Sequence, residues 1–165
     1  MGRIKVLSVF GTRPDTIKLA PVVAELSRHP EKICSVTVGT AQHRDMMDQV
    51  LAVFGISPDY DLGVMQDDQS LFDIVERGLR GLEEVLLREK PDITLVHGDT
   101  STAFAGALAS FYCRTEVGHV EAGLRTGHKF DPFPAEMNRR VVGCLADGHF
   151  APTTHHLGNL LRGNF

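Results

Sequence analysis

Short apolar runs rich in β-branched residues alternate with longer amphipathic segments along the whole chain. The runs have the length and composition of buried strands, and the segments between them repeat apolar residues at helical spacing. Strands are expected at residues 3–10, 33–38, 92–97, 117–122 and 148–151, with a short extended piece at 58–65. Strands that alternate with helices form a parallel sheet covered by helices on both faces. The sequence therefore predicts an α/β fold with a doubly wound parallel sheet of at least six strands.

The composition is that of an ordinary globular domain and excludes several classes of protein. With 165 residues, 42% of them hydrophobic and 23% charged, the chain can bury a core of its own. A net charge of −4 argues against a surface for nucleic acid or for an anionic membrane. No apolar run is long enough to cross a bilayer, and the N-terminus lacks a signal-peptide pattern. Three cysteines without a C-x-x-C pair argue against a disulfide framework or a thiolate zinc site, so we expect a cytoplasmic protein.

The apolar run at 117–122 ends in an ionisable loop and points to a functional site. Glu121 stands where this strand should emerge, Arg125 follows closely, and Glu136 lies on the next expected helix. Ligands of open α/β sheets bind beyond the carboxyl ends of the strands. We therefore interpret Glu121 as a site residue, the alternative being a strand-end glutamate in a solvated loop.

The turn after the first strand, residues 11–14 (GTRP), opens a helix whose free N–H groups could bind an anion. Arg13 and Lys18 add positive charge there, which favours phosphate binding. The alternative is a tight turn whose arginine pairs with a surface carboxylate. Because the turn has neither a G-x-G-x-x-G nor a Walker A pattern, a nicotinamide or flavin dinucleotide is disfavoured.

Two further strand-end loops carry polar residues. Gln42 and His43 follow the second strand, where His43 could contact a ligand or simply cap a helix. Asp99 follows the strand at 92–97, and its local pattern favours the role of a helix N-cap. Several loops of this kind at one edge of the sheet are much harder to explain as coincidence than any one of them alone.

Five motifs together carry a family resemblance: residues 11–14 (GTRP), 40–44 (TAQHR), 97–100 (HGDT), 118–126 (GHVEAGLRT) and 133–139 (FPAEMNR). In this order and spacing they resemble the non-hydrolysing UDP-N-acetylglucosamine 2-epimerases of bacteria and archaea. The residues found in these motifs argue against the hydrolysing relatives of this family. One departure is an aspartate after Arg-Pro where the family usually has a glutamate, which keeps the charge and shortens the reach.

The resemblance implies a glycosyltransferase-B-like architecture with an active site between two Rossmann-like domains. Residues 1–165 would form the N-terminal Rossmann-like domain only. The C-terminal nucleotide-binding domain, which in the family holds most uridine diphosphate contacts and a further catalytic histidine, would be absent from this chain. The full-length protein would resemble the homodimeric relatives.

The resemblance also implies a reaction, the interconversion of UDP-N-acetylglucosamine and UDP-N-acetylmannosamine by elimination and re-addition of UDP. Asp99, Glu121 and Glu136 would be the catalytic carboxylates, with the identity of the base open. Because clustered carboxylates repel, at least one should have a raised pKa and could serve as an acid. Arg13 and Lys18 would face the nucleotide or its phosphates.

Further expectations follow from the same resemblance. Gln42 and His43 match positions that bind a second UDP-N-acetylglucosamine as an activator in some members. No metal or redox cofactor is implied, and the pathway suggested is the synthesis of cell-envelope polysaccharide precursors. The alternative function is a stand-alone sugar-nucleotide-binding or regulatory module that does not catalyse.

Overall fold

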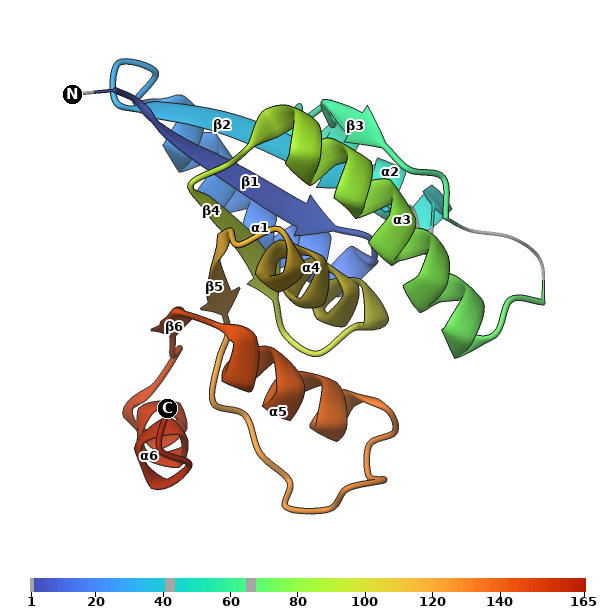
Figure 1. Ribbon diagram of the computed structural model, residues 1–165, viewed down its shortest axis with the longest axis vertical. Coiled ribbons are helices and arrows are strands. Elements are labelled where there is room, and N and C mark those ends of the chain that lie inside the picture. Colours follow the sequence, from blue (N-terminus) through green and yellow to red (C-terminus); the bar gives the residue numbers. More distant parts are fainter. Residues whose placement is uncertain (1, 41–43, 65–67) are drawn as a thin grey trace.

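A parallel six-stranded sheet forms the centre of the molecule (Figure 1). The computed structural model describes residues 2–40, 44–64 and 68–165. The strands are β1 (Ile4–Phe10), β2 (Ile33–Gly39), β3 (Tyr60–Asp61), β4 (Ile93–His97), β5 (Glu116–Val120) and β6 (Gly148–Phe150). The helices are α1 (Arg13–Ser27), α2 (Arg44–Phe54), α3 (Leu71–Glu89), α4 (Ser101–Tyr112), α5 (Ala135–Leu145) and α6 (Thr154–Arg162).

The strand order is β3-β2-β1-β4-β5-β6, and every neighbouring pair is parallel. The chain starts in the middle of the sheet, moves outward to β3, returns to β4 beside β1 and then moves outward to β6. This is the Rossmann order, with its switch point between β1 and β4. The prediction of a doubly wound parallel sheet with at least six strands is confirmed.

Helices cover both faces, and alternate residues of β1 feed two separate cores. Leu7 and Val9 pack with side chains of α3 and α4 on one face. Val6 and Phe10 pack with side chains of α1 and α2 on the other face. A strand buried on both faces must be apolar at nearly every position, which is why these runs stand out in the sequence.

Local signals set several element ends. Ser70 and Asp73 form the expected capping box, because the Asp73 carboxylate accepts from the Ser70 N–H and the Ser70 hydroxyl accepts from the Asp73 N–H. Gly55 ends α2 with a φ of +64°. Within the described part of the extended piece at 58–65, the strand is shorter than predicted, since it comprises Tyr60 and Asp61, which pair with β2.

Two absences concern the described residues only. Among their helices, none combines the length and the apolar character that a membrane span requires. Within the same residues, no group of three or more histidine, cysteine, aspartate or glutamate side chains is arranged to hold a metal ion.

Candidate active site

The carboxyl ends of β1, β4 and β5 bring three predicted site residues together. Asp99 follows β4 by two positions, and Glu121 follows β5 directly. Since His97 and Val120 are register partners in adjacent strands, the two loops start side by side. Lys18 reaches the same place from α1, with Nζ 3.4 Å from Glu121 Oε1. The expectation that these loops meet at one edge is therefore confirmed for the described residues.

Glu121 is held in a left-handed backbone conformation with a φ of +61°. Non-glycine residues rarely adopt this region, and such positions cluster at functional sites. Its side chain is 35% exposed, so the carboxylate remains open to a ligand. His97 Nε2 lies 2.7 Å from Oε2, while Lys18 approaches Oε1. The strand predicted for 117–122 ends at Val120 because Glu121 leaves extended geometry.

Asp99 and Glu136 are linked by one buried arginine. Arg139 Nε donates to Asp99 Oδ2 at 3.1 Å, and its Nη2 makes a second contact with the same oxygen. Arg139 Nη1 donates to Glu136 Oε2 at 3.2 Å. The Asn138 side chain also donates to the Asp99 backbone carbonyl at 2.9 Å. Hydrogen bonds from Asn138 and Arg139 thus connect the first turns of α5 to the loop after β4.

The local-pattern interpretation of Asp99 as a helix cap is wrong. Thr100 is the N-cap of α4, and its hydroxyl accepts from the Ala103 N–H. The Asp99 carboxylate instead binds Arg139 from a helix 40 residues away. Threonine takes the cap because it is the residue directly before the first helical turn.

Glu136 is almost completely buried, and its carboxylate accepts hydrogen bonds from three donors. Its carboxylate accepts from the Thr126 N–H at 3.0 Å, from the Gly127 N–H at 3.4 Å and from Arg139. Burial by itself raises the pKa of Glu136, but the two backbone donors and the Arg139 charge outweigh it and lower this pKa. Glu136 is therefore not the clustered carboxyl group with a raised pKa that the sequence led us to expect.

Burial raises the pKa of Asp15, a further carboxyl group at this edge. It accepts from the backbone N–H groups of Gly11 and Thr12, and its Oδ2 lies 3.5 Å from the Thr100 hydroxyl. These contacts join the turn after β1 to the turn after β4. The aspartate at this position is therefore part of the capping box of α1 and has a structural role, because it connects the two turns.

Arg13 is an exposed residue in the first turn of α1. Within the described residues it forms no salt bridge, so the alternative of a surface pairing finds no support there. The predicted activator residues Gln42 and His43 lie outside the described residues.

Sequence reasoning missed the residues that hold the carboxylates in place. Arg139 stands three residues after Glu136, a spacing that places both on one helix face and could have predicted their pairing. His97 gave no comparable signal, because a histidine at the end of an apolar strand is equally typical of a core position.

Comparisons with known proteins agree with this geometry. The model of the UDP-N-acetylglucosamine 2-epimerase family matches residues 24–165. The chain belongs to this family. It is 56% identical over 164 residues to the UDP-N-acetylglucosamine 2-epimerase of Bacillus subtilis, covering 99% of this chain and 43% of that protein. It is 55% identical over 161 residues to the Escherichia coli K12 enzyme of the same name, covering 98% of this chain and 43% of that protein.

Solved structures of family members have the same fold. A putative UDP-N-acetylglucosamine 2-epimerase from Listeria monocytogenes superposes with a TM-score of 0.95 at 53% identity, covering all of this chain and 43% of that one. The Neisseria meningitidis epimerase, bound to UDP-GlcNAc, gives a TM-score of 0.94 at 51% identity, with 98% and 43% covered. Acinetobacter baumannii MurG shares the fold alone, with a TM-score of 0.65 at 14% identity.

The chain spans less than half the length of the relatives it matches. It has the Rossmann-like fold of one half of these glycosyltransferase-B-like family members.

Proposed function

We propose that this chain is the N-terminal domain of a non-hydrolysing UDP-N-acetylglucosamine 2-epimerase. The observation that carries the proposal is the Glu121 carboxylate, which is partly exposed at a strand end with Lys18 beside it. The similar Neisseria meningitidis structure contains UDP-GlcNAc, which supports a UDP-sugar as the ligand.

The proposed reaction needs a base at C2 of the sugar and positive charge at the departing diphosphate. A carboxylate takes the C2 proton, the C–H electron pair forms the C1=C2 double bond, and the C1–O bond breaks with its electrons leaving on UDP. Re-addition of the UDP oxygen to C1 and of a proton to the other face of C2 gives the epimer. Lys18 and Arg13 would stabilise the diphosphate charge, with help from the N-terminus of α1.

The surroundings of the three carboxylates suggest different roles. Glu136 is 1% exposed and already accepts from three donors, so it would act by holding Arg139 and the loop at 126–127. Asp99 is held by Arg139 and would orient the sugar. The Glu121 carboxylate is partly exposed and no arginine holds it, so Glu121 is our candidate for the base that removes the C2 proton.

A matched pair of variants tests the role of Glu121 in the full-length protein. Glu121→Gln keeps the shape of the side chain and removes its charge, so turnover should fall by roughly 100-fold or more. Glu116→Gln makes the same change at the exposed, opposite end of β5 and should leave turnover within about twofold of wild type. Near-normal turnover in Glu121→Gln would return this residue to a structural role.

We also propose that a second, C-terminal domain completes the site. The family resemblance implies that most uridine diphosphate contacts come from this second domain, so the 165-residue chain alone should bind UDP-sugars weakly, with a Kd of about 1 mM or worse. A stand-alone binding module remains the alternative, and it requires clear binding by the isolated chain. The proposal that Gln42 and His43 form an activator site is based on the family resemblance alone.

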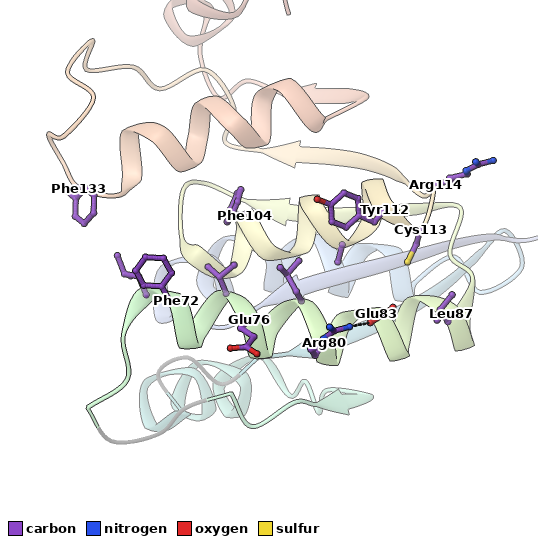
Figure 2. A pocket seen from close by; sticks show the side chains of 14 residues that line it. Phe72, Glu76, Arg80, Glu83, Leu87, Phe104, Tyr112, Cys113, Arg114 and Phe133 are labelled. Atoms are coloured by element: carbon purple, nitrogen blue, oxygen red, sulfur yellow. Dashed lines mark hydrogen bonds and ion pairs between the residues drawn. The ribbon is translucent and has the colours of Figure 1, made fainter.

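An apolar face on α3 and α4 supports the proposal that the full-length protein is a homodimer. Figure 2 shows Phe72, Phe104, Tyr112 and Phe133, which line a hollow between these helices and the segment before α5. The volume of this hollow is about 1060 Å³. Phe72 is 86% exposed and Tyr112 is 70% exposed. Contiguous exposed apolar surface of this kind is typical of protein interfaces, and a two-fold dimer would pair this face with the same face of a second copy.

Analytical ultracentrifugation of charged variants tests the dimer. Phe72→Glu should shift the protein toward monomer by burying a charge in the interface. Val53→Glu, on the exposed side of α2 away from this face, is the control and should leave the sedimentation unchanged. A dimer that survives Phe72→Glu unchanged would place the interface elsewhere.

Synthesis of polysaccharide precursors in the cytoplasm is the setting that we propose for this enzyme.

A further inference from the structure

His97 is a buried imidazole in direct contact with the proposed base. It is the last residue of β4 and is 4% exposed, and its Nε2 lies 2.7 Å from Glu121 Oε2. A deprotonated nitrogen and an ionised oxygen repel at this separation, so the contact is favourable only when one of them carries a proton.

The backbone fixes both residues in this contact. The Gly98 N–H donates to the Val120 carbonyl at 3.0 Å, which locks the residue after His97 to the residue before Glu121. On the far side of Glu121, the Ala122 N–H donates to the Phe150 carbonyl at 3.1 Å. The left-handed backbone of Glu121 then turns its side chain back over the end of β4.

The two ring nitrogens of His97 are not occupied by other hydrogen bonds within the described residues. Within the described part of the chain, neither ring nitrogen of His97 has a partner with good hydrogen-bond geometry. The 2.7 Å approach to Glu121 is therefore close but poorly aligned, as catalytic contacts often are before a substrate tightens them. Lys18 approaches the other oxygen, Oε1, so the two partners do not compete.

We propose that His97 is a positioning residue that holds Glu121 Oε2 and so aims Oε1 at the substrate. This inference rests on the proposed function of Glu121 as the base. A free glutamate side chain samples several rotamers, and misplacement of a reacting group by about 1 Å can cost roughly 100-fold in rate. The buried ring removes this freedom without contacting the substrate itself.

Nuclear magnetic resonance of the 165-residue chain tests the contact independently of activity. Long-range proton–nitrogen spectra of the labelled imidazoles report which ring nitrogen carries the proton. Glu121→Gln should shift the His97 Nε2 resonance, whereas Asp99→Asn, which alters the neighbouring loop after the same strand, should shift it much less. Equal His97 spectra in wild type and Glu121→Gln would overturn the proposal.

Kinetics of the full-length protein test the consequence. His97→Gln retains a donor near the position of Nε2 and should keep more activity than His97→Leu, which should lose about 10- to 100-fold in kcat with KM changed less than about threefold. Equal kcat in both variants and wild type, or a loss confined to KM, would overturn the proposal. An inactive wild-type protein would instead refute the proposed function, and the His97 spectra would still decide whether the contact exists.

Discussion

Removal of the Arg139 guanidinium should destabilise the fold strongly, because it leaves Glu136 buried without its positive partner. Both side chains are at least 95% buried, and Arg139 also binds Asp99. Breaking a buried pair by removing one partner typically costs 3–5 kcal/mol. Glu136 keeps two backbone donors, so we expect the lower end for Arg139→Met, about 3 kcal/mol. For a domain of this size, this corresponds to a fall in Tm of about 6–12 °C.

Chemical denaturation with a matched control measures this cost. Arg140→Met changes the next, exposed arginine of the same helix and should cost less than about 0.5 kcal/mol. Glu136→Gln added to Arg139→Met removes the stranded charge and should recover about 1 kcal/mol or more. If Arg139→Met costs no more than Arg140→Met, the reasoning that makes Arg139 the link between the two carboxylates is wrong.

The same variant has a predicted pH dependence. The folded-state pKa of Glu136 is lowered below its ordinary value of 4.5, so its contribution is present above that value and is lost as the pH falls through the lower, folded-state pKa. The difference in unfolding free energy between wild type and Arg139→Met should therefore be largest near neutral pH and shrink in acid. A difference that grows in acid would contradict this sign.

Three further predictions concern the glycine turn, a buried histidine and the isolated chain. Gly11→Ala places a Cβ 1.9 Å from Thr40 Oγ1 and should cost about 1–3 kcal/mol in urea unfolding, whereas Gly148→Ala, where no described atom lies within 4 Å, should cost less. Burial lowers the pKa of His119 to about 4, so stability should fall by up to about 3 kcal/mol as the pH drops from 6.5 to that value. His119→Gln should flatten this part of the pH profile, and an unchanged profile would assign it to another group. The 165-residue chain should unfold cooperatively by circular dichroism yet fail to epimerise UDP-N-acetylglucosamine, and clear turnover would mean that this domain rebuilds the cleft without a second one.

The fold could be read from the sequence because its signals are local. Runs such as Ile4–Phe10 must be apolar on both faces, and the capping box at Ser70 marks a helix start without reference to any distant residue. The length of the strand at Tyr60–Asp61 was overestimated because pairing at a sheet edge depends on the neighbouring strand, and β3 pairs with Val38 and Gly39 at the carboxyl end of β2.

The site was harder to predict because its geometry depends on distant partners. The loop pattern around Asp99 favoured a cap, and only the packing of α5 against the loop after β4 reveals its pairing with Arg139. The pKa of Glu136 likewise depends on the Thr126 and Gly127 N–H groups, whose direction no sequence pattern specifies. The role of His97 could not be predicted for the same reason, since its contact with Glu121 joins the ends of two neighbouring strands, β4 and β5.

Deuterium incorporation during turnover tests the proposed reaction most directly. The full-length protein would be incubated with UDP-N-acetylglucosamine in heavy water and followed by proton NMR. Since the proposed base exchanges the C2 proton with solvent, UDP-N-acetylmannosamine should form with deuterium at C2, and Glu121→Gln should slow both events together by roughly 100-fold. Epimerisation that retains the original C2 proton, or wild-type protein that forms no epimer, would contradict the account.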